Sequence, residues 1–359
     1  MYDEVDKDLA AKMHKAISII QFKLECQLIK RHPNYGMDER ILLDKIDYQN
    51  GTIKIEDKVY ELKDKNFPTI NPEKPFELTE EENTLIQTLA ASFINSPVLQ
   101  RHTNYIYDKG GIYKIFNGNL LYHGCIPTKE DGSFDDVYID GQYLSGMKYL
   151  KQVEDKVRKA FYCEAGSEEQ LNALDYCWYL WSGPKSPLFG KNKMTTFERY
   201  FIEDKATHKE HYNPYYYHIE HKEYCKSILK EFNLDVDKSH IVNGHVPVKT
   251  HKGESPIKGE GILLVIDGGL SKAYHKNTGI GGYTLISNSN VMIIAEHRPF
   301  AEVVESGFKI SPKTTIVERF NKRITVGETD TGKELSKRIS DLSELLDAYK
   351  SGMVKEKRG

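Results

Sequence analysis

Two short apolar runs, far apart in the chain, each end at a histidine beside a glycine. The first is "NLLYHG", residues 119–124, and the second is "HIVNGH", residues 240–245. Short runs of this composition predict β-strands. A histidine at the mouth of a strand, followed by a tight turn, can point a neutral ring nitrogen into a metal site. His123 and His245 are therefore candidate ligands of one cation, although two ligands are too few for a catalytic site. A single strand-end histidine is more often an ordinary hydrogen-bonded residue.

The remaining patterns alternate between helix and strand, which predicts an α/β fold. Asn50-Gly51 and Asn117-Gly118 are typical of tight turns, so we expect a β-meander at about 45–62 and a hairpin at 111–124. The strands between 241 and 297 are expected to form much of one sheet. Residues 182–213 are expected to be irregular. The expected helices span 7–31, 80–95, 146–162, 168–181, 218–232 and 333–350, and the first carries an apolar stripe of Leu9, Met13, Ile17, Ile20, Leu24 and Leu28.

The last expected helix has apolar residues at alternating spacings of four and three. This spacing is typical of a heptad seam. The seam can pack on the body of the protein or on another subunit, and we expect the body. Its members are Leu335, Ile339, Leu342, Leu346 and Tyr349.

Bulk composition excludes several classes of protein. The formal net charge of −3 argues against a protein that binds nucleic acid by neutralising phosphates. No stretch approaches 18 apolar residues, so no membrane span is expected. The five cysteines form no CxxC pair, which favours the reducing cytoplasm. The acidic start of the chain gives no sign of a targeting segment.

Longer stretches around the two histidines resemble a known family. "LLYHGCIP" and "NGHVPVK" resemble the late metal-ligand elements of the calcineurin-like metallophosphoesterases. "SGPKSPLFGKNKMTTFERYF", "IVNGHVPVKTHKGESPIKGEG" and "LLVIDGGLSKAYHKNTGIGGYTLI" closely resemble the class III fructose-1,6-bisphosphatases of Gram-positive bacteria. The resemblance covers essentially the whole chain. It implies part of a metallophosphoesterase β-sandwich flanked by helices, with the meander as an insertion, over residues 1–315. A linker and helix would follow over 316–359.

The same resemblance implies a phosphoric monoester hydrolase of gluconeogenesis. The reaction would convert fructose 1,6-bisphosphate to fructose 6-phosphate and phosphate, with a dinuclear Mn²⁺ site or, alternatively, Mg²⁺. His123 and His245 would bind the second metal. The superfamily's DxH, GDxxDRG and GNH[DE] motifs are absent here. The sequence therefore looks like a C-terminal half, and we expect the chain alone to be weakly active or inactive. Two alternatives are a non-catalytic sugar-phosphate-binding subunit that needs an N-terminal half in trans, and a phosphoprotein phosphatase relative. A homo-oligomer is a further partner class.

Candidate substrate-binding residues are cations close to glycines, hydroxyls or the second histidine. Arginine suits bidentate contact with phosphate, and lysine suits point-charge contact. Lysines are also common on surface loops. Asp267 ends a strand and could orient a metal-binding histidine. The candidate cations are Lys185, Lys191, Lys193, Arg199 and Lys249.

Three further motifs have competing interpretations. Two HxxH pairs, 208/211 and 218/221, could form a zinc site, but their spacing fits no zinc motif well. Cys125 follows His123 closely, yet a small buried thiol is the simpler interpretation. The Gly-rich stretch 277–283 could cradle phosphate, but a turn between strands is the better expectation.

Overall fold

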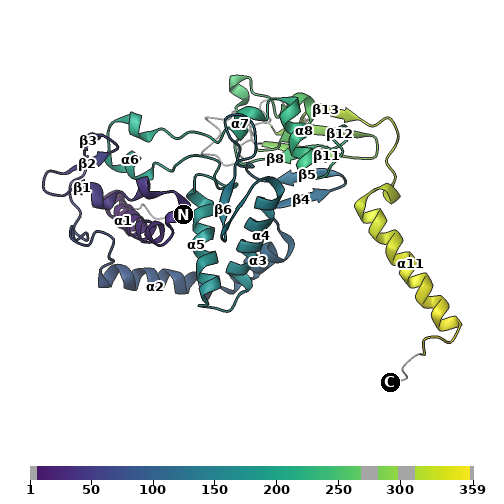
Figure 1. Cartoon of the computed structure of the whole chain (residues 1–359), viewed down its shortest axis with the longest axis horizontal. Coiled ribbons are helices and arrows are strands. Elements are labelled where there is room, and N and C mark those ends of the chain that lie inside the picture. The colour runs from purple at the N-terminus through teal and green to yellow at the C-terminus, as the bar shows by residue number, and fades with distance from the viewer. Residues whose placement is uncertain (1–5, 268–281, 298–311, 356–359) are drawn as a thin grey trace. The chain divides into compact units, whose positions relative to one another are not determined.

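The computed structural model describes residues 6–267, 282–297 and 312–355 (Figure 1). Within these residues the chain is a mixed α/β protein with several small sheets. The chain divides into two compact units, and each unit is built from two separate stretches of the sequence. Unit 1 comprises Met1–Ile112 and Cys125–Tyr217, and unit 2 comprises Tyr113–Gly124 and His218–Gly359. The sequence predicted a boundary near residue 315, between a catalytic domain and a C-terminal linker and helix. The division into these two units does not test that boundary, which stays a prediction.

Unit 1 is mainly helical, and most of its helices begin at side-chain caps. Thr79 and Glu82 form the predicted capping box of α2, and the Ser167 hydroxyl accepts from the Gln170 amide at 3.2 Å at the start of α5. The helices are α1 (Lys7–Arg31), α2 (Glu80–Ile94), α3 (Pro97–Lys109), α4 (Gly146–Tyr162), α5 (Glu168–Ser182) and α6 (Thr196–Phe201). Short 3₁₀ turns lie at Pro33–Tyr35, Asp38–Arg40, Leu43–Lys45 and Lys205–His208.

The expected apolar stripe of α1 is wrong in its first half. Leu9 and Met13 are 55% and 64% exposed. The buried face lies in the second half of the helix and contains Ile20, Phe22 and Ile29. Periodicity identifies an amphipathic helix, but only tertiary contacts decide which turns are covered.

The predicted β-meander is confirmed as a three-stranded antiparallel sheet. Its strands are β1 (Ile46–Asp47), β2 (Thr52–Ile55) and β3 (Lys58–Glu61). Gly51 adopts a φ of +66° in the turn before β2. A hairpin of β6 (Val137–Ile139) and β7 (Gln142–Leu144) was not predicted. Nor was α6, which interrupts the stretch expected to be irregular.

Unit 2 contains a five-stranded sheet in the order β4-β5-β8-β10-β9. The central strands β5, β8 and β10 run parallel, and β4 and β9 pair antiparallel at the edges. β4 (Tyr113–Phe116) and β5 (Asn119–Tyr122) form the predicted hairpin, with positive φ at both Asn117 and Gly118. The other strands are β8 (Ile241–Asn243), β9 (Ile257–Lys258) and β10 (Leu263–Val265). α8 (Lys222–Glu231) lies in the helix predicted at 218–232, α7 (Tyr215–His218) precedes it, and 3₁₀ turns lie at Thr250–Lys252 and Gly259–Gly261.

The expectation that the strands from 241 to 297 form much of one sheet is wrong. β11 (Gly282–Ser287) and β12 (Val291–His297) pair with each other and with β13 (Lys313–Arg319) in a separate antiparallel sheet. β13 was not predicted. Strand patterns reveal which residues are extended, but they do not identify the neighbouring strand.

The final helix is confirmed as α11 (Asp330–Lys350), preceded by a 3₁₀ turn at Val326–Glu328. The expectation that its seam packs on the body is not met, because all five predicted seam residues are 46–65% exposed. In the described parts of the chain, no helix is both long and apolar enough to cross a membrane.

Candidate functional site

The parallel strands of unit 2 deliver three chemically active side chains to one edge of the sheet. Leu120 of β5 pairs with Ile241 of β8, and Ile241 pairs with Leu263 of β10. His123 directly follows β5, while His245 and Asp267 each lie two residues beyond β8 and β10. Because these strands run in the same direction, their carboxyl ends meet at one edge. That edge is where open α/β sheets commonly bind ligands.

The two histidines converge. His245 Nδ1 lies 3.3 Å from His123 Nε2, and the ring planes meet at 76°. Two nitrogens each about 2.1 Å from one ion, at an angle between a right angle and the tetrahedral angle, are roughly 3.0–3.4 Å apart. The observed separation therefore fits two ligands of a common cation.

The backbone that holds His245 is strained. The Val246 amide donates to the Gly244 carbonyl at 2.8 Å, and His245 itself has a φ of +68°. This is a γ-turn in its rarer form, a conformation that costs energy for any residue with a Cβ. Strain of this kind persists where the surroundings over-determine the backbone, and it is common at ligand sites.

Neighbouring bonds fix the turn onto the end of β5. The Gly244 amide donates to the His123 carbonyl at 2.9 Å. The buried Asn243 side chain donates its amide to the Gly124 carbonyl. Sequence reasoning did not assign a role to Asn243. The signal was available, because an asparagine inside an otherwise apolar strand requires a hydrogen-bond partner when buried.

The electrostatics favour neutral imidazole at His123. Burial lowers its pKa, the neighbouring His245 lowers it further, and Asp267 acts in the opposite direction. Neutral imidazole is the form that binds metal. A Cβ built on Gly244 would lie 3.6 Å from His123 Nδ1 and 3.7 Å from Asp267 Cβ, so Asp267 is a close neighbour of the pair. Its predicted orienting role stays a prediction.

Within the described residues, the site offers two candidate nitrogen ligands and no complete ligand set. Across residues 6–267, 282–297 and 312–355, no group of three or more His, Cys, Asp or Glu side chains is placed to hold a metal ion. The arrangement can therefore supply part of a coordination sphere.

Four of the five predicted substrate-binding cations lie in unit 1. Lys185 forms an ion pair with Asp135 at 3.0 Å, and Lys191 with Glu210 at 2.8 Å. Arg199 donates to the His208 carbonyl at 2.9 Å and also lies 3.6 Å from Glu210. These contacts give the three cations structural partners. Whether they also bind substrate is untested, so their substrate role stays a prediction.

The other two candidate cations have different surroundings. Lys193 is half-buried in the same loop region of unit 1. Lys249 is half-buried in unit 2, where its backbone amide donates to Glu254 at 2.9 Å. It is therefore the candidate in the same unit as the histidine pair.

The alternative motifs gain no support. The His208 ring nitrogen Nε2 lies 3.1 Å and 3.0 Å from the carbonyls of Glu198 and Ile202, which accounts for this side chain structurally. Burial raises the pKa of the Cys125 thiol to about 12, so the buried, unreactive interpretation of this residue is the better one. Residues 277–281 of the Gly-rich stretch lie outside the described residues, and the next two residues begin β11.

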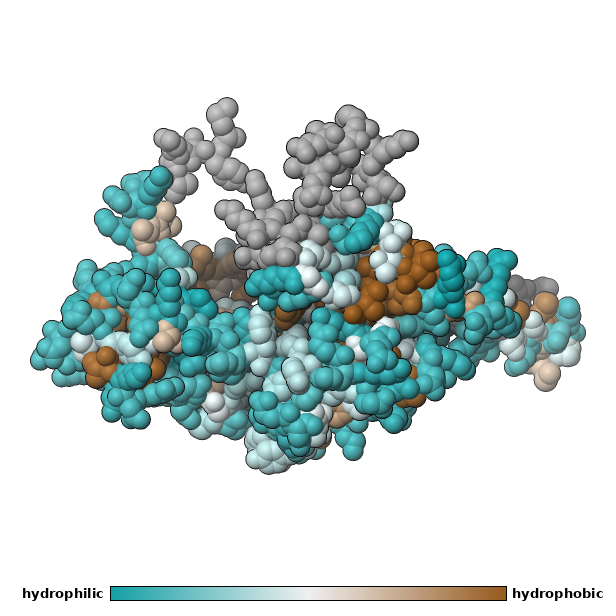
Figure 2. Space-filling model, turned by 90° about the horizontal axis from the view of Figure 1, so that it is seen from above, coloured by the Kyte–Doolittle hydropathy of each residue, from teal (hydrophilic) through white to brown (hydrophobic). Residues whose placement is uncertain are grey.

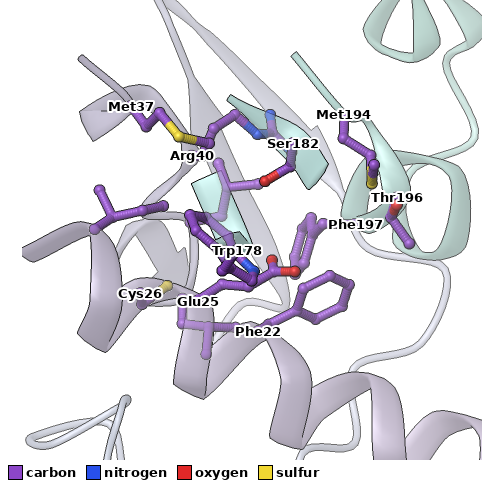
Figure 3. A pocket seen from close by; sticks show the side chains of 13 residues that line it. Phe22, Glu25, Cys26, Met37, Arg40, Trp178, Ser182, Met194, Thr196 and Phe197 are labelled. Carbon is purple, nitrogen blue, oxygen red and sulfur yellow. The ribbon is translucent and has the colours of Figure 1, made fainter. Parts of the chain in front are cut away.

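None of four cavities found among the described residues is lined by His123 or His245, and two of them show where such hollows lie. One lies in unit 1, where Phe22, Trp178 and Phe197 face a common space (Figure 3). Its volume of about 30 Å³ suits a single water. The other, about 450 Å³ in unit 2, lies beside the amino ends of β5 and β8, at the edge opposite the histidines. Its polar residues are mostly occupied in turns and caps, such as Asn117 with Asp330 and Thr325 with Glu328.

Comparisons with known proteins agree on one family. The model of the Firmicute fructose-1,6-bisphosphatases matches residues 1–351. A relative from Clostridium botulinum (strain Kyoto / Type A2), named fructose-1,6-bisphosphatase class 3, is 51% identical over 99% of this chain and 53% of its own length. The protein of that name from Clostridium novyi (strain NT) is 51% identical over 97% of this chain and 53% of its own length. No solved structure matches.

These findings correct two expectations. The match extends over essentially the whole chain, and the chain spans about half the length of the curated relatives it matches. This statement replaces the description of the chain as a C-terminal half. The expectations of an inactive fragment, of a non-catalytic subunit and of a protein phosphatase relative find no support, because the matched family and relatives are named fructose-1,6-bisphosphatases.

Proposed function

Because this chain belongs to the Firmicute fructose-1,6-bisphosphatase family, we propose that it hydrolyses fructose 1,6-bisphosphate to fructose 6-phosphate and phosphate. The observation that supports this most directly is the approach of His123 Nε2 to His245 Nδ1 at 3.3 Å, at the carboxyl edge of parallel strands. The reaction belongs to gluconeogenesis, and the cytoplasm is its proposed location. The parallel order β5-β8-β10 is also compatible with the proposed metallophosphoesterase sandwich.

The histidine pair is proposed to hold a divalent cation, Mn²⁺ in preference to Mg²⁺. Mg²⁺ strongly favours oxygen ligands, and Mn²⁺ tolerates imidazole better. Such a cation would polarise a phosphoryl oxygen and lower the pKa of a water molecule. The protein's own contribution is to keep two ring nitrogens aimed at one point, through the γ-turn at His245 and the Asn243–Gly124 bond. Asp267 is proposed to orient an imidazole, as carboxylates commonly do beside metal-binding histidines.

Substrate binding needs cations near the phosphates. Lys249 is proposed first, because it lies four residues after His245 in the same unit. Lys185, Lys191, Lys193 and Arg199 also remain proposed substrate contacts, and three of them would have to bind phosphate while keeping or exchanging their present partners.

The test combines phosphate release with a separate measurement of metal binding. The wild-type chain, His123→Ala, His245→Ala and the control His102→Ala are assayed with Mn²⁺ on fructose 1,6-bisphosphate and on a phosphopeptide. His102 is exposed on α3 and distant in sequence from the pair. Mn²⁺ binding is followed by electron paramagnetic resonance. We expect the wild-type chain to hydrolyse fructose 1,6-bisphosphate and not the phosphopeptide. We expect His123→Ala and His245→Ala, but not His102→Ala, to lose Mn²⁺ affinity by roughly tenfold or more.

The readouts separate the parts of the proposal. Equal Mn²⁺ binding by all four proteins would reject the histidine pair as a metal site. Hydrolysis of the phosphopeptide but not of the bisphosphate would reject the proposed substrate.

A further inference from the structure

Unit 1 contains a cavity of about 360 Å³, which we call the Tyr35 cavity, lined among others by Asn34, Tyr35, Asp140 and Asn172. It lies between the turn of the β6–β7 hairpin, the 3₁₀ turn Pro33–Tyr35 and helices α4 and α5. Sites for small molecules commonly have volumes of about 300–1,000 Å³, so this cavity suits one small ligand. Polar side chains alone do not mark a binding site, because hydrophilic residues cover most of the face seen in Figure 2. The case for a ligand therefore depends on how the lining groups are combined.

Aromatic rings form part of the lining of the Tyr35 cavity. His32 and Tyr35 stack with their ring centroids 4.7 Å apart and their planes at 13°. Tyr176 meets the Tyr35 ring edge-on at 6.1 Å, and its hydroxyl lies 3.0 Å from that of the buried Tyr149. Tyr35 and Tyr176 are themselves buried, so the core of unit 1 fixes their rings. Such a lining offers dispersion contact to the C–H groups of a ligand.

Three polar side chains of the lining make no hydrogen bond to any residue that the structure describes. They are the carboxamides of Asn34 and Asn172 and the hydroxyl of Tyr35. Each carboxamide can donate two hydrogen bonds and accept others, and the hydroxyl can do both. Tyr35 is only 9% exposed, and hydroxyls on buried rings normally have a partner. The cavity therefore combines aromatic rings with polar groups that a ligand can satisfy.

The charged groups around the Tyr35 cavity already have partners. Asp140 and Lys156, which both line the cavity, form an ion pair with each other. His32 Nε2 lies 2.7 Å from an oxygen of Asp175, and the same carboxylate accepts from Arg31 at 2.9 Å. A phosphate would therefore have to compete with a carboxylate for its cation, and an ammonium group would have to compete with a cation for its carboxylate. This balance favours an uncharged ligand.

The hairpin turn that borders the cavity is fastened to helix α4. Asp140 and Gly141 both have positive φ, of +47° and +83°, as the turn between β6 and β7 requires. Gln152 of α4 donates to Asp140 at 3.0 Å, and Lys156 of the same helix pairs with Asp140. A border that is held in place without a ligand lowers the cost of binding one, because little further ordering is needed.

We propose that the Tyr35 cavity binds a neutral sugar ring. A pyranose presents C–H groups on its faces and a rim of hydroxyls that both donate and accept. The C–H groups match the aromatic lining, and the hydroxyls match the carboxamides of Asn34 and Asn172, which also donate and accept. A sugar phosphate matches less well, because Lys156 is already paired. The cavity is therefore a site for a ligand other than the bisphosphate substrate, and it does not depend on the proposed reaction.

The experiment is a saturation-transfer NMR titration of the full chain with the methyl pyranosides of glucose, galactose and mannose. The wild type is compared with Asn34→Ala and Asn172→Ala, and with Asn104→Ala as the matched control on the exposed surface of α3. We expect at least one glycoside to bind the wild type and Asn104→Ala equally. Asn34→Ala and Asn172→Ala should each weaken that binding by roughly fivefold or more, because a hydrogen bond to a sugar hydroxyl is lost. Circular dichroism checks that all four proteins keep their helix content.

Two further titrations separate this cavity from the histidine site and test the charge of its ligand. His245→Ala should bind the glycoside like the wild type, and glucose 6-phosphate should bind no more tightly than the neutral glycoside. The proposal is overturned if none of the three glycosides binds the wild type, or if Asn34→Ala and Asn172→Ala bind as the wild type does. Loss of glycoside binding in His245→Ala would assign the sugar to the histidine site instead. Tighter binding of glucose 6-phosphate in this cavity would overturn the neutral ligand.

Discussion

The Val246 amide donates to the Gly244 carbonyl across 2.8 Å, and this bond closes a γ-turn around His245. His245 has a φ of +68°, where any Cβ is strained. Replacing His245 by Gly should therefore remove both the imidazole and the strain, whereas Ala removes only the imidazole. We expect His245→Gly to be more stable than His245→Ala by about 1 kcal/mol, with Mn²⁺ binding lost in both.

The measurement pairs urea unfolding with metal binding for both variants. His102→Gly and His102→Ala in the interior of α3 provide the control pair, since Gly is the less favourable residue inside a helix. If His245→Gly and His245→Ala unfold at the same urea concentration, the turn does not store strain.

A buried ion pair joins α1 to the start of α2. Lys23 is fully buried, and its Nζ lies 2.7 Å from Glu82 Oε2 and 2.6 Å from the Thr69 carbonyl. Lys23→Met should lower the free energy of unfolding by about 3 kcal/mol, because it leaves Glu82 unpaired in a buried position. The double variant Lys23→Met/Glu82→Gln should recover part of this loss, since Gln is uncharged.

Urea unfolding of the two variants and the wild type measures the coupling. Lys15→Met is a suitable comparison, because Lys15 pairs with the partly exposed Asp64 and should cost much less. A Lys23→Met variant as stable as Lys15→Met would mean that the buried pair contributes little.

Local sequence signals identified many elements of this fold but missed α3, α6, β6, β7 and β13, and they identified the contacts between elements poorly. The Asn117-Gly118 turn and the Thr79–Glu82 box appeared where predicted, because each depends on residues within one turn of chain. The stripe at Leu9 and Met13 and the single sheet from 241 to 297 were wrong, because burial and strand pairing depend on distant segments.

The candidate site shows the same difference between features set by local sequence and features set by distant contacts. His123 and His245 could be selected from their strand-end positions, since parallel strands bring their carboxyl ends together. The strained turn and the Asn243–Gly124 bond could not be read from the sequence, since both require the backbone geometry. Glu210 was also missed. Its role in pairing Lys191 depends on the path of the loop between them.

Glu210 should make the stability of unit 1 depend on pH. Burial raises its pKa, but hydrogen bonds from Lys191 and Thr195 outweigh burial and lower the pKa from 4.5 to about 2. The stabilisation is therefore complete above pH 4.5 and is lost as the pH falls toward 2. Glu210→Gln should lose up to about 3 kcal/mol at neutral pH and show a flatter pH dependence below pH 4.5.

Unfolding free energies at pH 7 and pH 3 test this expectation. The exposed neighbour Glu203, changed to Gln, is the matched control. If the gap between the two pH values is as large in Glu210→Gln as in the wild type, another carboxylate causes the acid sensitivity.

The cysteines provide a test of the rejected nucleophile. Burial raises the pKa of Cys125 and of Cys225 to about 12, and both thiols are buried, whereas Cys163 is only half-buried. In native protein at neutral pH, iodoacetamide should therefore modify Cys163 faster than Cys125 by roughly tenfold or more. Peptide mass spectrometry at successive times measures each site, and protein in urea, where all five cysteines react, is the control. If Cys125 in the native protein is modified as fast as Cys163, its thiolate is accessible. Cys125, two residues after His123, would then again be a candidate nucleophile.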